Sequence, residues 1–80
     1  MRFEPTYINR EKMYSIGIDT DTDSPMLEVV CGGVAMWTEY YRLTIDEFEN
    51  YPANRQQIDQ LAYACARGER PDRRINIREN

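Results

Sequence analysis

Residues 26–43 read MLEVVCGGVAMWTEYYRL, which predicts a long β-hairpin. Apolar residues alternate before the glycine pair, and aromatic residues are frequent after it, as is typical of strands. Two glycines between two strands favour a tight two-residue turn, because glycine tolerates the positive φ that such turns need. We therefore predict a turn at Gly32-Gly33 that pairs Cys31 with Val34.

Both faces of this predicted hairpin are apolar, because cross-strand partners share a face. One face carries Leu27, Val29, Cys31, Val34, Met36 and Tyr40. The other face carries Val30, Ala35, Trp37, Tyr41 and Leu43, interrupted by Glu28 and Glu39. A single helix covers only one face, and a large apolar face left open marks an interaction site. The second face is therefore covered by the N-terminal residues Phe3, Tyr7 and Ile8, by a second copy of the chain, or by another protein.

The residues before the hairpin predict a further strand and a polar turn. Residues 13–18 alternate as MYSIGI and predict a strand, and residues 19–25 read DTDTDSP and predict a turn. Asp19, Asp21 and Asp23 match three positions of a calcium-binding loop, but the glycine and the glutamate that complete such a loop are missing. We expect a solvated turn or an acidic contact for a basic partner.

Two helices are predicted after the hairpin. Thr44 and Glu47 form a capping-box pattern, which begins a short helix over about residues 45–50. Asn54 begins a second helix, which ends near Gly68. The apolar stripe of the second helix contains Ile58, Leu61, Ala62 and Cys65.

These elements together predict one α+β domain over residues 1–80. A small antiparallel sheet is packed by one main C-terminal helix and one short helix. Residues 1–11 form an N-terminal arm. Residues 69–80 form a basic tail or, because Ile75 and Ile77 alternate with polar residues, a short edge strand.

The composition argues against catalysis. The chain has no histidine and no CxxC motif, so we expect no zinc site, no redox role and no cofactor. Cys31 and Cys65 are expected to be reduced and buried. The sequence has neither an apolar run that could span a membrane nor the apolar segment of a secretion signal. We therefore expect a cytoplasmic protein that is not an enzyme.

Charge is divided unevenly along the chain. Residues 1–50 carry a net charge of −6 and residues 51–80 a net charge of +2, which gives −4 for the whole chain. An acidic protein repels nucleic acid and attracts basic proteins, so we expect no direct nucleic-acid binding. The arginines of the tail are interleaved with acidic residues, which predicts solvated ion pairs.

The order of the elements resembles that of the small cytoplasmic immunity proteins that bacteria encode beside polymorphic or contact-dependent toxins. The resemblance covers about residues 14–75 and is carried by a strand ending in IGID, a polar turn with proline, LEV, EYYRLTIDEFENY, a helix and DRRI. It implies a protein that binds and neutralises a cognate toxin domain, often a nuclease. Carboxylates would then stand in for phosphates, and aromatic side chains would fill the groove of the nuclease.

On this interpretation the partner contacts are Trp37, Tyr41, Glu39, Asp19, Asp21 and Asp23. Tryptophan and tyrosine are the residue types that most often carry binding energy at an interface, although strands also favour them for their own sake. The alternative is a structural or regulatory homodimer that uses the apolar face. No catalytic residue and no metal ligand is assigned.

Overall fold

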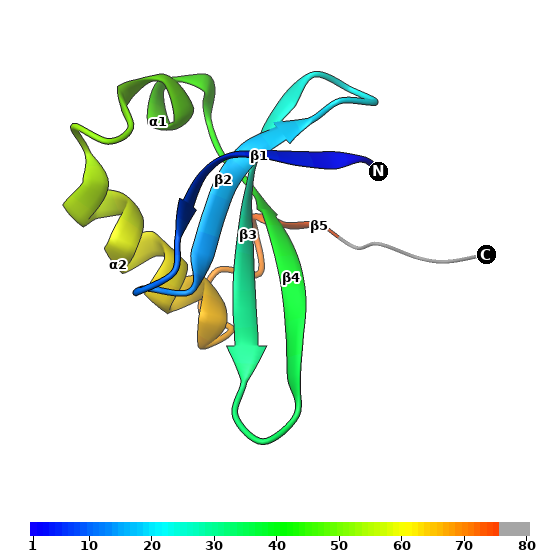
Figure 1. Ribbon diagram of the computed structural model, residues 1–80, viewed down its shortest axis with the longest axis vertical. Coiled ribbons are helices and arrows are strands. Elements are labelled where there is room, and N and C mark those ends of the chain that lie inside the picture. The colour runs from blue at the N-terminus through cyan, green and yellow to red at the C-terminus, as the bar shows by residue number, and fades with distance from the viewer. Residues whose placement is uncertain (76–80) are drawn as a thin grey trace.

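Five antiparallel strands and two helices make up the molecule (Figure 1), which confirms the predicted α+β class. The computed structural model describes residues 1–75. Its strands are β1 (Phe3–Asn9), β2 (Tyr14–Asp19), β3 (Ser24–Gly32), β4 (Met36–Arg42) and β5 (Arg74–Ile75), and they lie in the sheet in that order. The helices α1 (Ile45–Asn50) and α2 (Arg55–Ala66) connect β4 to β5.

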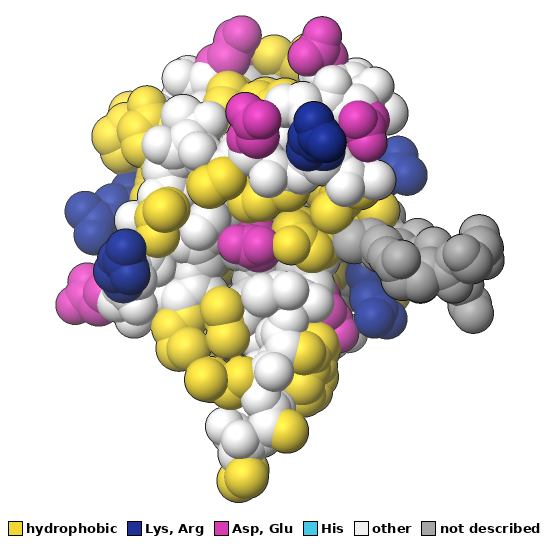
Figure 2. Space-filling view, turned by 45° about the vertical axis from the view of Figure 1, so that its right-hand side comes forward, with side chains coloured by type: hydrophobic (Ala, Val, Ile, Leu, Met, Phe, Trp, Pro, Cys, Tyr) yellow, Lys and Arg dark blue, Asp and Glu magenta, His cyan; other side chains and the backbone are white. Residues whose placement is uncertain are grey.

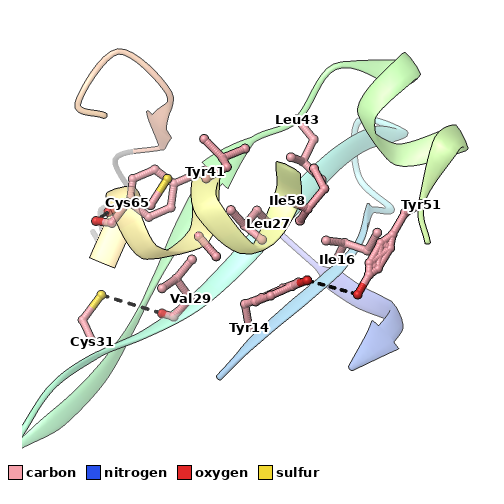
Figure 3. Close-up of a cluster of buried hydrophobic side chains, with 12 residues drawn as sticks. Tyr14, Ile16, Leu27, Val29, Cys31, Tyr41, Leu43, Tyr51, Ile58 and Cys65 are labelled. Carbon is pink, nitrogen blue, oxygen red and sulfur yellow. Dashed lines mark hydrogen bonds between the residues drawn. The ribbon is translucent and has the colours of Figure 1, made fainter. Parts of the chain in front are cut away.

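The core lies between the sheet and the helices (Figure 3). Its strand residues alternate along β2, β3 and the end of β4, because every second side chain of a strand points to the same face. They are Tyr14, Ile16, Leu27, Val29, Cys31, Tyr41 and Leu43. The helical side contributes Tyr51 and the predicted stripe of Ile58, Leu61, Ala62 and Cys65, all of them buried. The predicted packing of the second helix is therefore confirmed.

A buried polar contact closes one end of this core. The hydroxyl of Tyr14 donates a hydrogen bond of 2.6 Å to Asp59 Oδ1 and lies 3.1 Å from the hydroxyl of Tyr51 (Figure 3). Burial and the hydrogen bond to Asp59 raise the pKa of Tyr14, so this hydroxyl keeps its proton and remains a donor. The contact ties β2 to the start of α2.

The predicted capping box begins α1 at the predicted residue. The backbone N–H of Glu47 donates to Thr44 Oγ1 at 3.0 Å, and the N–H of Thr44 donates to Glu47 Oε1 at 2.9 Å. Arg73 adds two hydrogen bonds to the Glu47 carboxylate, of 2.8 and 3.0 Å. Burial raises the pKa of Glu47, but the hydrogen bonds from Arg73 and Thr44 and the charge of Arg73 together outweigh it, and the net pKa is lowered. The cap of α1 is thereby also the anchor of β5.

Helix α2 begins at the predicted place with different chemistry. Asn54 is its N-cap, but its side chain makes no capping bond. Instead, Asn54 Nδ2 donates to the backbone oxygen of Glu47 at 3.0 Å and joins the two helices. At the other end, Gly68 has a φ of 75° and its N–H donates to the Cys65 oxygen at 3.0 Å, so the prediction that the helix ends at this glycine is confirmed.

The predicted register of the hairpin is wrong by three residues. Cys31 faces Trp37 and Leu27 faces Tyr41, so the loop is longer than two residues. A shift by an odd number moves every side chain of β4 to the opposite face. Tyr41 and Leu43 thereby join the core beneath the helices. Burial of a large aromatic side chain favours this register over the turn preference of two glycines.

The N-terminal residues form β1, where the sequence predicted only an arm. A bulge between Pro5 and Tyr7 separates residues that point to opposite faces of the sheet. Phe3 packs edge-on against Tyr40 on the face away from the helices, with ring centroids 5.5 Å apart. Tyr7 packs against Tyr51 on the helical side, at 5.1 Å. Phe3 therefore covers part of the second face, as one interpretation of the sequence proposed, whereas Tyr7 does not.

The last strand is short. β5 confirms the edge strand predicted for the tail as far as Ile75, which faces Tyr40. Ile77, the second residue of that predicted strand, lies outside the described residues. Neither helix in residues 1–75 has the length and apolar character needed to cross a membrane.

Gly17 tests how tightly β1 is held against β2. A Cβ added there meets the backbone oxygen of Glu4 and lies 2.8 Å from Pro5 Cα, both of them backbone atoms that cannot rotate away. We expect Gly17→Ala to lower the free energy of unfolding by about 1–3 kcal/mol in urea titrations. Gly33→Ala is the matched control, because a Cβ there meets nothing within 4 Å, and its effect should stay within about 0.5 kcal/mol. Equal losses of unfolding free energy in the two variants would show that β1 moves away from residue 17 at no cost, which would contradict tight packing of β1 against β2.

Candidate functional site

The hairpin of β3 and β4 extends past the end of α2 (Figure 1). We call residues 32–38 of this hairpin the hairpin end. It exposes large apolar side chains: Val34 is 108% exposed, Met36 63% and Trp37 52%. Figure 2 shows hydrophobic side chains gathered at this end of the molecule. No charged residue occurs from Val29 to Thr38, so the hairpin end is both exposed and uncharged.

Trp37 is exposed but held in one position. Its Nε1–H donates a hydrogen bond of 2.8 Å to Glu39 Oε2. Its ring lies over Gly32, where an added Cβ would come within 2.6 Å of the ring atom Cζ3. Gly32 has a φ of 88°, which favours glycine for a second, independent reason. The indole is thus fixed by one hydrogen bond and by a close approach to the backbone.

Glu39 connects this exposed ring to the core. The Tyr41 hydroxyl donates to Glu39 Oε1 at 2.6 Å, and Arg74 Nη2 donates to Oε2 at 3.3 Å. These donors, Tyr41 first and Trp37 second, lower the pKa of the Glu39 carboxyl against the opposing effect of burial. The carboxylate therefore accepts from a core residue, an exposed residue and β5 together.

A cavity of about 300 Å³ lies beside this carboxylate. The residues that line it include Trp37, Glu39, Arg67, Arg70 and Arg74. Each of these arginines is paired: Arg67 with Glu69 at 3.0 Å, Arg70 with Asp72 at 2.9 Å, and Arg74 with Glu39. The acidic partners balance the guanidinium groups, so the cavity carries no excess positive charge that would favour an anion. The ion pairs predicted for the tail are therefore confirmed as far as Arg74.

The two cysteines are free and buried, as predicted. Burial raises the pKa of both thiols, to about 11 for Cys65. A thiol that keeps its proton at neutral pH is a poor nucleophile and a poor metal ligand. Within residues 1–75, moreover, no three carboxyl or thiol side chains lie close enough to hold a metal ion.

The predicted acidic contact residues lie at the other end of the sheet. Asp19 is buried and accepts hydrogen bonds from the N–H of Arg2 at 3.1 Å and of Asp21 at 3.0 Å. The bond from Arg2 is the main cause of its lowered pKa. Asp21 is exposed and pairs with the terminal amine at 3.4 Å, and Asp23 is exposed in the same turn. Asp19 therefore holds the β2–β3 turn, while the other two carboxylates face solvent.

Of the six predicted contact residues, the structure brings together Trp37, Glu39 and Tyr41, but only Trp37 presents a large surface. Tyr41 is 2% exposed and belongs to the core. The acidic turn is separated from the hairpin end by the length of β3, about 30 Å for a nine-residue strand. Val34 and Met36 are exposed at the hairpin end but were not among the predicted contact residues, although the uncharged run from Val29 to Thr38 was a signal for both.

The lowered pKa of Glu39 predicts a specific loss of stability in acid. A carboxyl with a depressed folded pKa stabilises the protein fully above its unfolded pKa, about 4.3, and loses that contribution as the pH falls through the folded value. We expect Glu39→Gln to lower the free energy of unfolding by about 1–3 kcal/mol at pH 7, because a neutral amide is a weaker acceptor. The difference in unfolding free energy between the variant and the wild type should be smaller at pH 3 than at pH 7.

Urea titrations of both proteins at the two pH values measure this gap. Glu49→Gln, at an exposed position on α1, is the control and should leave stability nearly unchanged at both. A gap for Glu39→Gln that is the same at pH 7 and pH 3 would contradict the assigned role of the carboxylate.

Comparison with known proteins gives this site no counterpart. No protein-family model, curated protein or solved structure matches the chain. What the hairpin end can do therefore follows from its own geometry: it presents a fixed aromatic ring and flexible apolar side chains on an uncharged projection.

Proposed function

We propose that this chain is a non-catalytic binding protein of the immunity type, which docks onto a cognate toxin domain through the hairpin end and neutralises it. The observation that carries the proposal is Trp37, which is 52% exposed although its Nε1–H is bonded to Glu39 and its ring lies on Gly32. A large ring that is half exposed and already held in place suits an anchor for a partner surface.

The fixed position of Trp37 favours tight binding. Ordering a side chain at an interface costs about 0.5–1.5 kcal/mol, and a ring that is already ordered avoids most of this cost. Val34 in the loop and Met36 on the opposite face of β4 are exposed as well, so the hairpin end offers apolar side chains on more than one side. The hairpin end therefore combines an anchor with further apolar contact surface.

Charge acts at longer range in this proposal. The chain has a net charge of −4, and acidic side chains gather at the end of the molecule away from the hairpin end (Figure 2). Exposed carboxylates such as Asp21 and Asp23 attract a basic partner and speed the encounter, whereas the uncharged hairpin end makes the contact. A basic toxin domain with an apolar groove fits both properties.

Substitution of Trp37 tests the proposal directly. We expect Trp37→Ala to weaken binding to the toxin domain encoded beside this chain by more than about 2 kcal/mol, or about 30-fold in Kd. Isothermal titration calorimetry measures the affinity, and survival of cells that produce the toxin domain measures neutralisation. Both should fall together.

Ile45→Ala provides a matched control, because Ile45 is an exposed apolar residue at the start of α1, far from the hairpin end. Its affinity should equal that of the wild type. Wild-type affinity in Trp37→Ala would remove the hairpin end from the interface. Absence of binding by the wild-type chain would reject the immunity function itself.

A further inference from the structure

Glu28 places a carboxylate on the face of the sheet that the helices leave open. Its neighbours in β3, Leu27 and Val29, are buried in the core, so Glu28 points to the opposite face. Ser15 of β2 and Tyr40 of β4 lie directly across from it, and cross-strand partners share a face. Because β3 is the middle strand, this half-buried carboxylate lies at the centre of the open face.

Within residues 1–75, one hydrogen bond holds this carboxylate. The hydroxyl of Tyr40 donates to Glu28 Oε2 at 2.7 Å, and the Tyr40 ring is itself packed against Phe3. No ion pair joins Glu28 to a cationic side chain in this part of the chain. An ionised carboxylate can accept about four hydrogen bonds, so most of its acceptor capacity is open to water or to a ligand.

A cavity of about 210 Å³ adjoins Glu28 on the side of β1 and β2. Ile8, Met13 and Val30 give it an apolar lining, and Ser15 contributes a hydroxyl. Ile8 is 58% exposed and Met13 45%, so aliphatic surface is accessible around the carboxylate. The cavity thus combines apolar walls with two oxygen acceptors from neighbouring strands.

We propose that this cavity binds an arginine side chain of a partner protein, with the guanidinium paired to Glu28. A guanidinium presents parallel N–H donors that match a carboxylate, and Ser15 Oγ can accept a further hydrogen bond. The methylene groups of the arginine pack along Ile8, Met13 and Val30 while its charge reaches Glu28. An arginine therefore uses both the apolar and the acidic part of the cavity.

One cationic side chain of the chain itself, Arg10, also borders the cavity. It is exposed, and no ion pair joins it to Glu28. The net charge of −4 attracts a cationic partner at long range, whereas Arg10 repels a guanidinium that enters the cavity. Removal of Arg10 should therefore strengthen binding, the opposite of the effect of removing the Glu28 charge.

The cavity adjoins the hairpin end, so one partner can contact both. Val30, in the wall of the cavity, lies opposite Thr38 of the hairpin end. Trp37 is on the other face of β4, across from the buried Cys31, so substitutions can remove the two contacts separately. The inference rests on the proposed function only for the identity of the partner, a basic toxin domain.

Butylguanidinium, a small model of the arginine side chain, tests the cavity without a protein partner. In ¹H–¹⁵N NMR spectra of the full chain at constant ionic strength, it should cause saturable shifts of the Ser15, Glu28 and Val30 amides. Its neutral counterpart butylurea should bind about three- to tenfold more weakly, because it lacks the charge that pairs with the carboxylate.

Glu28→Gln keeps an oxygen for the Tyr40 hydroxyl and should remove the preference for butylguanidinium over butylurea. Glu49→Gln is the matched control, because it removes the same charge from an exposed position on α1, and it should keep the preference. Arg10→Gln should bind butylguanidinium more tightly than the wild type does. If circular dichroism shows Glu28→Gln to be unfolded, Met13→Lys at the exposed rim replaces it, because its ammonium group repels the ligand.

The inference is overturned if the wild type binds the two compounds equally or if the shifts occur only elsewhere. A preference that persists in the folded Glu28 or Met13 variant has the same consequence. So does weaker binding of butylguanidinium by Arg10→Gln, since Arg10 would then be part of the binding site.

Calorimetry with the toxin domain encoded beside this chain tests the identity of the partner. Glu28→Gln should raise the Kd for the toxin domain about tenfold, and Glu49→Gln should leave it unchanged. A toxin domain that binds the wild type and Glu28→Gln equally well would show that the cavity lies outside the interface and would overturn the assignment of the partner. If the wild type does not bind the toxin domain at all, the proposed function fails, and the butylguanidinium titration decides the cavity by itself.

Discussion

The pairing of Leu27 with Tyr41 is the constraint on which the rest of this structure depends. It directs Tyr41 and Leu43 into the core, and it fixes which residues of β4 face the helices. The Tyr41 hydroxyl donates to the backbone oxygen of Cys65 at 2.9 Å and so ties β4 to α2. Burial raises the pKa of Tyr41, which keeps this hydroxyl a donor. A one-residue slip would place the ring in solvent and remove this tie, so the register is strongly specified.

The same hydroxyl also helps to fix the position of a side chain at the surface. The single proton of Tyr41 is shared between Glu39 Oε1, at 2.6 Å, and the Cys65 oxygen, and Glu39 in turn accepts from Trp37 and Arg74. The bonds from Tyr41 and Trp37 to the Glu39 carboxylate are short and have a charged acceptor, which makes them stronger than neutral hydrogen bonds. The position of an exposed ring is thus determined, through Glu39, by a core residue four positions along the same strand.

Local signals in the sequence were sufficient for the helices. Thr44 and Glu47 determine the start of α1 by themselves, and Gly68 ends α2, because both effects involve only neighbouring residues. The hairpin required more than local information. The two glycines favour a short turn, but burial of Tyr41 against α2 selects the register, and that contact joins residues far apart in the chain. The prediction gave a local preference too much weight against a long-range one.

Strand β1 and the arrangement of the site could not be predicted from local sequence signals either. Pro5 and the bulge after it interrupt the alternation that marks a strand, so β1 could not be recognised from its own residues. Trp37 could be proposed as a contact from its residue type. That it is held by Glu39, and that Tyr41 lies in the core rather than beside it on the surface, follows only from the register.

The exposure of the hairpin end has a simple geometric cause. The nine residues of β3 extend about 30 Å, whereas the twelve residues of α2 extend about 18 Å and stop at the left-handed turn of Gly68. The helical layer is therefore too short to cover the far end of the hairpin. Because the core ends where α2 ends, the residues beyond it contribute little to the stability of the fold, and their apolar character is not explained by packing within residues 1–75. A fixed tryptophan on an uncharged projection is the feature on which the proposed binding function rests.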